Sequence, residues 1–151
     1  MNNLRVLSPR RRTLVRAFAA IVLGLLLLIA AIFKWRDPGY SADFYGTLTK
    51  GTPSLALAIV AAESILGLWL LSGFRRSFAG VSTLFLLALF TGAIVFDIFS
   101  PHPKPCGCFG EVWAAAHNPI LIERWLALGV MRNIVLMALA AFLFLAPPTK
   151  A

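Results

Sequence analysis

The sequence predicts an all-α membrane protein, a bundle of four transmembrane helices. Of its 151 residues, 60% are apolar and only 13% are charged, and a soluble domain of this length cannot cover so much apolar surface. The apolar residues gather in four long runs, each near the roughly 20 residues that a helix needs to cross a bilayer core. These runs are residues 17–33, 53–71, 78–99 and 126–146.

The first two runs differ in how they handle charge. Residues 17–33 contain no charged side chain and are flanked by Arg16 and Lys34, long side chains that can reach the polar interface from a short span. Residues 53–71 are interrupted only by Glu63, near the middle of the run. Gly67 follows four residues later on the same helical face, where we expect a neighbouring helix to approach closely.

The last two runs each contain one charged residue. Asp97 lies near the end of the third run, and Arg132 lies several residues inside the fourth. A charge at the centre of a span costs about 2.5–3.5 kcal/mol on insertion scales, so Arg132, Asp97 and Glu63 each need a partner or a role. Their depth in the membrane predicts that Arg132 pairs with Asp97. Glu63 is a second candidate partner for Arg132. Such charges hold helices together as an ion pair, serve a proton path or a polar contact to a quinone head group, or lie at the solvated boundary of the membrane.

The basic residues predict the orientation of the bundle. The N-terminal segment, the hairpin at Arg75 and Arg76 and the C-terminal tail together carry eight Lys or Arg residues and no acid. The two loops on the other side mix five basic with four acidic residues. The positive-inside rule therefore places both termini in the cytoplasm. The predicted parts are a basic cytoplasmic segment at residues 1–16, a four-helix membrane domain at 17–146 with an outer loop at 100–125, and a cytoplasmic tail at 147–151.

This distribution also limits the kinds of partner. The formal net charge of +8 is arranged as a topology pattern along the loops, which argues against nucleic-acid binding. The lipid bilayer is the expected environment, and the inner membrane of a bacterium is the expected location. The 100–125 loop then faces the extracytoplasmic side, an oxidising space in which disulfides persist.

The outer loop contains the most informative motif, Cys106-Gly107-Cys108, which holds the only two cysteines of the chain. A disulfide stabilises a fold mainly by closing a long loop, and a bridge between near neighbours constrains almost nothing. Gly107 permits the tight turn that such a bridge requires. Strained and exposed disulfides are the labile, redox-active kind, so the pair indicates chemistry or metal binding rather than structural cross-linking.

Several short motifs along the chain match those of a known family. The matching elements are Lys34-Trp-Arg-Asp-Pro38, Glu63 with Gly67-Leu-Trp-Leu-Leu71 and Arg75-Arg76, Cys106-Gly-Cys-Phe-Gly110, and Arg132-Asn133. With these motifs the chain resembles the MauE family of methylamine-utilisation membrane proteins, which is close to the DoxX-like family, over about residues 14–146. The resemblance implies a role in the maturation of the disulfide-rich small subunit of methylamine dehydrogenase, together with a thioredoxin-like partner.

The leading hypothesis is thus a thiol–disulfide oxidoreductase-like activity in which Cys106 and Cys108 cycle between dithiol and disulfide. Lys104, and His102 when protonated, would favour the reactive thiolate of a nearby cysteine. The four runs contain no cysteine, so electrons would pass to the thioredoxin-like partner or to a quinone in the bundle.

Two alternatives stay open. His102, Cys106, Cys108 and His117 form a two-sulfur, two-nitrogen set that suits copper or zinc, although Cys-x-Cys is tighter than the usual spacing of structural zinc ligands. In the second alternative the cysteines are inert and the protein is a non-catalytic assembly subunit. It would then belong to an oligomer or to a larger membrane complex.

Overall fold

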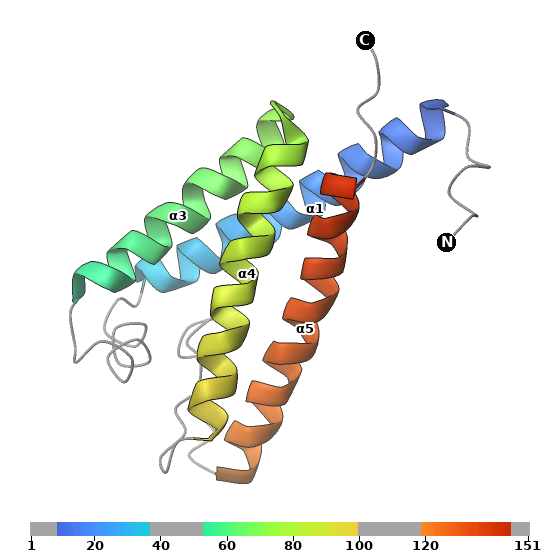
Figure 1. Ribbon diagram of the computed structural model, residues 1–151. Coiled ribbons are helices and arrows are strands. Elements are labelled where there is room, and N and C mark those ends of the chain that lie inside the picture. The colour runs from blue at the N-terminus through green and yellow to red at the C-terminus, as the bar shows by residue number, and fades with distance from the viewer. Residues whose placement is uncertain (1–8, 37–52, 100–118, 146–151) are drawn as a thin grey trace.

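The computed structural model of the protein describes residues 9–36, 53–99 and 119–145, and Figure 1 shows their arrangement. Every regular element in these ranges is a helix: α1 (Pro9–Arg36), α3 (Pro53–Ser72), α4 (Arg76–Ile98) and α5 (Pro119–Leu145). Each contains a segment long and apolar enough to cross a membrane. The predicted all-α, four-helix membrane fold is therefore confirmed.

Two helices extend well beyond their apolar runs. α1 begins at Pro9 and continues to Arg36, and α5 begins at Pro119, seven residues before the fourth run. Proline suits the first position of a helix because its missing N–H would have no helical partner there. Both helices thus reach past the lipid core, since only their central parts need to be apolar.

A tight turn joins α3 to α4. Gly73 has φ of +72° and Arg75 has φ of +44°, both in the left-handed region. The turn is closed by the indole Nε1 of Trp69, which donates to the Phe74 carbonyl at 2.8 Å. The Arg75 guanidinium lies 5.5 Å from the centroid of the Phe74 ring. This turn forces α3 and α4 to run in opposite directions.

The helices pack mainly as two pairs, α1 with α3 and α4 with α5. α1 and α3 approach most closely at Gly24 and Gly67, where a Cβ atom added to Gly24 would lie 2.9 Å from the Gly67 carbonyl oxygen. The close approach expected at Gly67 is therefore confirmed. Buried side chains from α1, α3, α4 and α5 form one core between the pairs; among them are Leu23, Leu70, Leu87 and Leu143.

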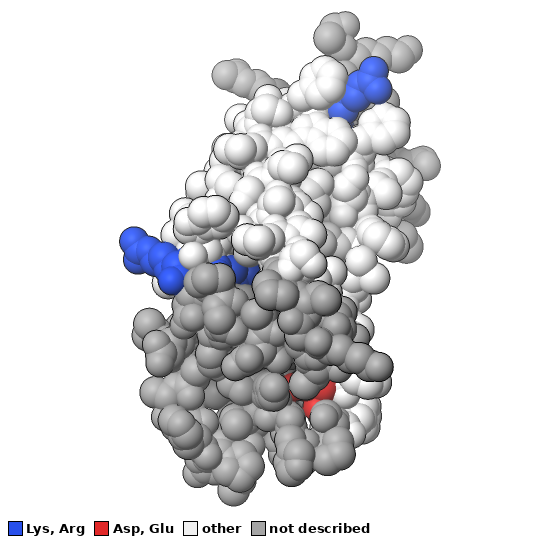
Figure 2. Space-filling view, turned by 90° about the vertical axis from the view of Figure 1, so that its left-hand side faces the viewer, with Lys and Arg blue, Asp and Glu red and all other residues white. Residues whose placement is uncertain are grey.

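The outer surfaces of the helices are strongly apolar. Large hydrophobic side chains such as Phe18, Ile65, Phe85 and Val135 are exposed on the described helices. In Figure 2 a broad band of uncharged residues separates basic side chains above from basic side chains below. A surface of this kind is stable in lipid rather than in water, which fits the predicted bilayer environment.

The bundle has two distinct ends. At one end of the bundle, which we name the loop end, α1 and α4 end and α3 and α5 begin (Figure 1). The α3–α4 turn, the start of α1 and the finish of α5 lie at the opposite end, which we name the turn end. Because α4 finishes and α5 begins at the loop end, the chain segment that contains the cysteines connects two helices there.

Candidate functional site

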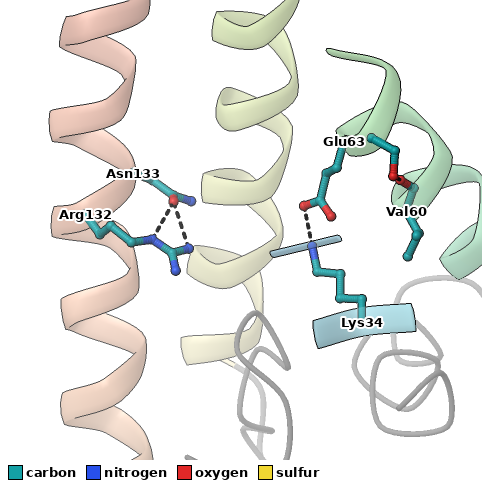
Figure 3. Close-up of polar contacts among 6 residues, drawn as sticks. Lys34, Val60, Glu63, Arg132 and Asn133 are labelled. Carbon is teal, nitrogen blue, oxygen red and sulfur yellow. Dashed lines mark hydrogen bonds and ion pairs between the residues drawn. The ribbon is translucent and has the colours of Figure 1, made fainter. Parts of the chain in front are cut away.

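An ion pair is buried between the first two helices. Lys34 of α1 and Glu63 of α3 each have only 1% of their surface exposed, and the Lys34 Nζ atom donates a hydrogen bond to Glu63 Oε1. Figure 3 shows the two side chains extended toward one another. The same Nζ lies 4.6 Å from the centroid of the Phe90 ring on α4, within the range of a cation–π interaction. Lys34 therefore links three helices.

Helix direction explains why Lys34 turns inward. It lies two residues before the end of α1, and side chains on a helix tilt toward its N-terminus. For α1 that direction leads away from the loop end and into the bundle. Glu63 is ten residues from the start of α3, about 15 Å along its axis, so a lysine that points inward can approach its carboxylate.

A second polar group lies on α5. Arg132 donates from Nη2 and Nε to the Asn133 Oδ1 atom, at 3.0 and 3.3 Å. Arg132 is half-buried, whereas Asn133 has no exposed surface. The guanidinium requires an acceptor, so these two contacts identify the oxygen of the Asn133 amide. The other atom, Nδ2, has no hydrogen-bond partner among the described residues.

A cavity of about 30 Å³ lies between these two polar groups. Its polar lining consists of Lys34, Glu63, Arg132 and Asn133, and the rest is leucine side chains with Ala30 and Phe90. A cavity needs only about 10–15 Å³ to hold one water molecule. The bundle thus contains a small, partly open cavity whose lining is mainly apolar and includes four polar residues.

Asp97 is buried near the end of α4, with 2% of its surface exposed. Ile94, three residues before Asp97 on α4, belongs to a small buried cluster with Ala56 and Leu126. The pairing of Asp97 with Arg132 stays a prediction. Glu63 has Lys34 as a partner, which the depth argument did not consider.

Several predicted site residues lie outside the described residues. These are Cys106, Cys108, His102, Lys104 and His117, together with most of the 100–125 loop. Within the described ranges, no group of three or more His, Cys, Asp and Glu side chains could hold a metal ion. That observation tests neither the thiol–disulfide hypothesis nor the metal-binding hypothesis, because both depend on residues of the 100–125 loop.

Sequence reasoning missed two members of the buried polar group. It treated Lys34 as a flanking charge, since the first apolar run ends at Phe33 and the helix continues to Arg36. It noted Asn133 only as part of the Arg132-Asn133 motif and not as a buried polar residue. Asparagine in an apolar run is itself a signal, because an amide inside a membrane helix needs a partner.

The family model described as methylamine utilisation protein MauE matches residues 12–146. The chain belongs to the MauE family. The match begins inside α1, ends just after α5 and spans the segment with both cysteines. No curated protein and no solved structure matches the chain significantly.

Membership of the MauE family agrees with the resemblance found in the motifs. It makes the chain a multi-pass membrane protein of a family named for methylamine utilisation. Within this MauE chain, the Lys34–Glu63 pair joins α1 to α3, and the Arg132–Asn133 pair of α5 lines the same cavity. The same four residues belong to the motifs on which the resemblance was based.

Proposed function

We propose that this MauE family member carries out thiol–disulfide exchange through Cys106 and Cys108, on the extracytoplasmic side of the bacterial inner membrane. The observation that carries the proposal is that a MauE chain has only two cysteines and that a single glycine separates them. That spacing contributes almost nothing to stability. A cysteine pair with no structural value is best explained by its chemistry.

The chemistry requires no other redox group in the loop. The thiolate of one cysteine attacks a disulfide of the partner, which forms a mixed disulfide and releases one partner thiolate. The second cysteine then attacks the mixed disulfide, and the partner leaves as a dithiol. Two electrons and two protons have moved from Cys106 and Cys108 to the partner, and the reverse sequence restores them.

The proposed partner is a thioredoxin-like protein on the same side of the membrane. Family membership supports this assignment, because the resemblance implies joint action with such a protein in the maturation of a disulfide-rich client. The client that it implies is the small subunit of methylamine dehydrogenase. If so, deletion of this gene in its own host prevents growth on methylamine, and the intact gene restores it.

The decisive experiment traps the intermediate. In cells with an affinity-tagged chain, Cys106→Ser or Cys108→Ser should abolish client maturation and leave abundance in the membrane near normal. One of the two variants should accumulate a mixed disulfide with the thioredoxin-like protein, visible on a non-reducing gel and lost on reduction. The doubly substituted chain serves as the control and should trap nothing.

Other outcomes would identify the alternatives. A metal site would lose bound metal on either cysteine substitution, weaken on His102→Ala and give no reductant-sensitive adduct. Full client maturation by the doubly substituted chain would overturn the proposal and leave an assembly role. Both results are measured on the same purified membranes, by elemental analysis and by client activity.

A further inference from the structure

Most of the polar residues that line the cavity between the helix pairs are hydrogen-bond donors. Lys34, Arg132 and Asn133 bring hydrogen-bond donors to it, whereas Glu63 is the acidic residue of its lining. Asn133 has no exposed surface, and its Nδ2 atom has no hydrogen-bond partner among the described residues. A buried donor without an acceptor costs free energy, so the amide is suited to a group that supplies an acceptor oxygen.

The position of the cavity restricts what that group is attached to. Apart from the four polar residues, the lining is apolar, and the outer faces of the surrounding helices expose large hydrophobic side chains. A molecule that arrives through such surroundings dissolves in the hydrocarbon core. At about 30 Å³ the cavity holds the oxygen-bearing edge of such a molecule, and the remainder must displace leucine side chains.

The charges of the lining act in opposite directions on an anionic ligand, because Glu63 repels it and Arg132 attracts it. The Lys34 ammonium is already paired with the Glu63 carboxylate, and a second carboxylate beside Glu63 would be repelled. A carbonyl oxygen accepts from the Asn133 amide and from cationic donors without adding charge. Carbonyl oxygens on an apolar ring and tail are the defining chemistry of quinones.

We propose that the carbonyl of a membrane-dissolved quinone binds in this cavity, with Asn133 Nδ2 as a donor, and that the quinone accepts electrons from the cysteine pair. The electron-transfer part rests on the proposed function; the binding part does not. Oxidation of the two thiols to a disulfide releases two electrons and two protons. Addition of these to the quinone gives the quinol, so the reaction balances without another reagent.

The test uses the purified full-length chain in lipid nanodiscs and decylubiquinone as the probe. Calorimetric titration should give saturable binding, which Asn133→Leu weakens tenfold or more. Asn133→Asp keeps an acceptor for Arg132 and replaces the free donor with an acceptor, so it should weaken binding at least as much. Thr91→Val is the matched control, because the Thr91 hydroxyl donates to the Leu87 carbonyl at 2.8 Å within α4 and does not line the cavity.

The outcomes separate this inference from the proposed function. Absence of binding, unchanged affinity in both Asn133 variants, or equal competition by laurate would overturn the quinone site and leave thiol exchange intact. Cys106→Ser should bind decylubiquinone normally but fail to reduce it when a thiol reductant is supplied. Normal binding without quinone reduction by the native chain would reject the quinone as electron acceptor, and mixed-disulfide trapping would test the proposed function separately.

Discussion

At the scale of single residues, the Lys34–Glu63 pair is the most consequential feature. Both side chains are almost completely buried, and they connect α1 to α3, while Phe90 brings α4 to the same ammonium group. Removal of charges from water is costly, so a buried ion pair is weak evidence for net stabilisation. Loss of one member is a different matter, because the other charge stays buried without compensation.

This asymmetry gives a double-substitution test. Lys34→Met should destabilise the bundle by about 3–5 kcal/mol, the usual effect of removing one partner of a buried pair in soluble proteins. Lys34→Met combined with Glu63→Leu should recover most of that loss, because neither charge remains. The measurement is the unfolding free energy in mixed micelles. A double variant that is no more stable than Lys34→Met would show that the pair does not act as a unit.

The residue scale is also where prediction from sequence was weakest. Depth along each apolar run correctly drew attention to Glu63, Asp97 and Arg132 as buried or half-buried charges. It did not find Lys34 as the partner of Glu63, since the choice depends on how far α1 continues and where its side chains point. A one-dimensional pattern contains neither the tilt of a helix nor the reach of its side chains.

At the scale of the helices, the interface between α1 and α3 depends on two glycines. A Cβ atom at Gly67 would lie 3.0 Å from the Gly24 carbonyl oxygen and 2.8 Å from Leu28 Cγ. Backbone atoms cannot move aside as a flexible side chain can. The sequence allowed the prediction of a close approach at Gly67, because Gly67 shares a helical face with Glu63. The part played by Gly24 became clear only from the packing of α1 against α3.

Gly67→Val should therefore force α1 and α3 apart and destabilise the bundle by about 1–3 kcal/mol, the usual cost of overpacking. Gly92→Ala is the matched control, since no heavy atom lies within 4 Å of a Cβ added at Gly92 on α4. The control should be neutral or slightly stabilising because alanine favours helix. Thermal unfolding of both variants measures the difference, and equal melting temperatures would contradict the close-packed interface.

Helix ends were harder to predict than helix existence. All four runs correspond to helices, because about 20 apolar residues leave a chain in lipid few alternatives to a helix. The starts of α1 at Pro9 and α5 at Pro119 lie outside those runs. Residues beyond the hydrocarbon core are not required to be apolar, so hydropathy alone contains no information about where such a helix begins.

At the scale of the whole molecule, topology decides which compartment the cysteines meet. Along the chain, Cys106 and Cys108 lie between α4 and α5, and α4 ends and α5 begins at the loop end, opposite the α3–α4 turn. Eight basic residues and no acid belong to the termini and that turn. The positive-inside rule therefore predicts that the turn end is cytoplasmic and that the loop end faces outward.

Labelling of intact spheroplasts checks this orientation. A thiol reagent that cannot cross membranes should label the reduced native chain at Cys106 or Cys108 while the inner membrane is still intact. The control is Phe74→Cys in a chain with both native cysteines replaced by serine, because Phe74 is 64% exposed on the α3–α4 turn. That control should be labelled only after the inner membrane is opened. The opposite pattern would place the cysteine pair in the reducing cytoplasm, where a disulfide seldom persists, and would remove the compartment on which the proposed exchange reaction depends.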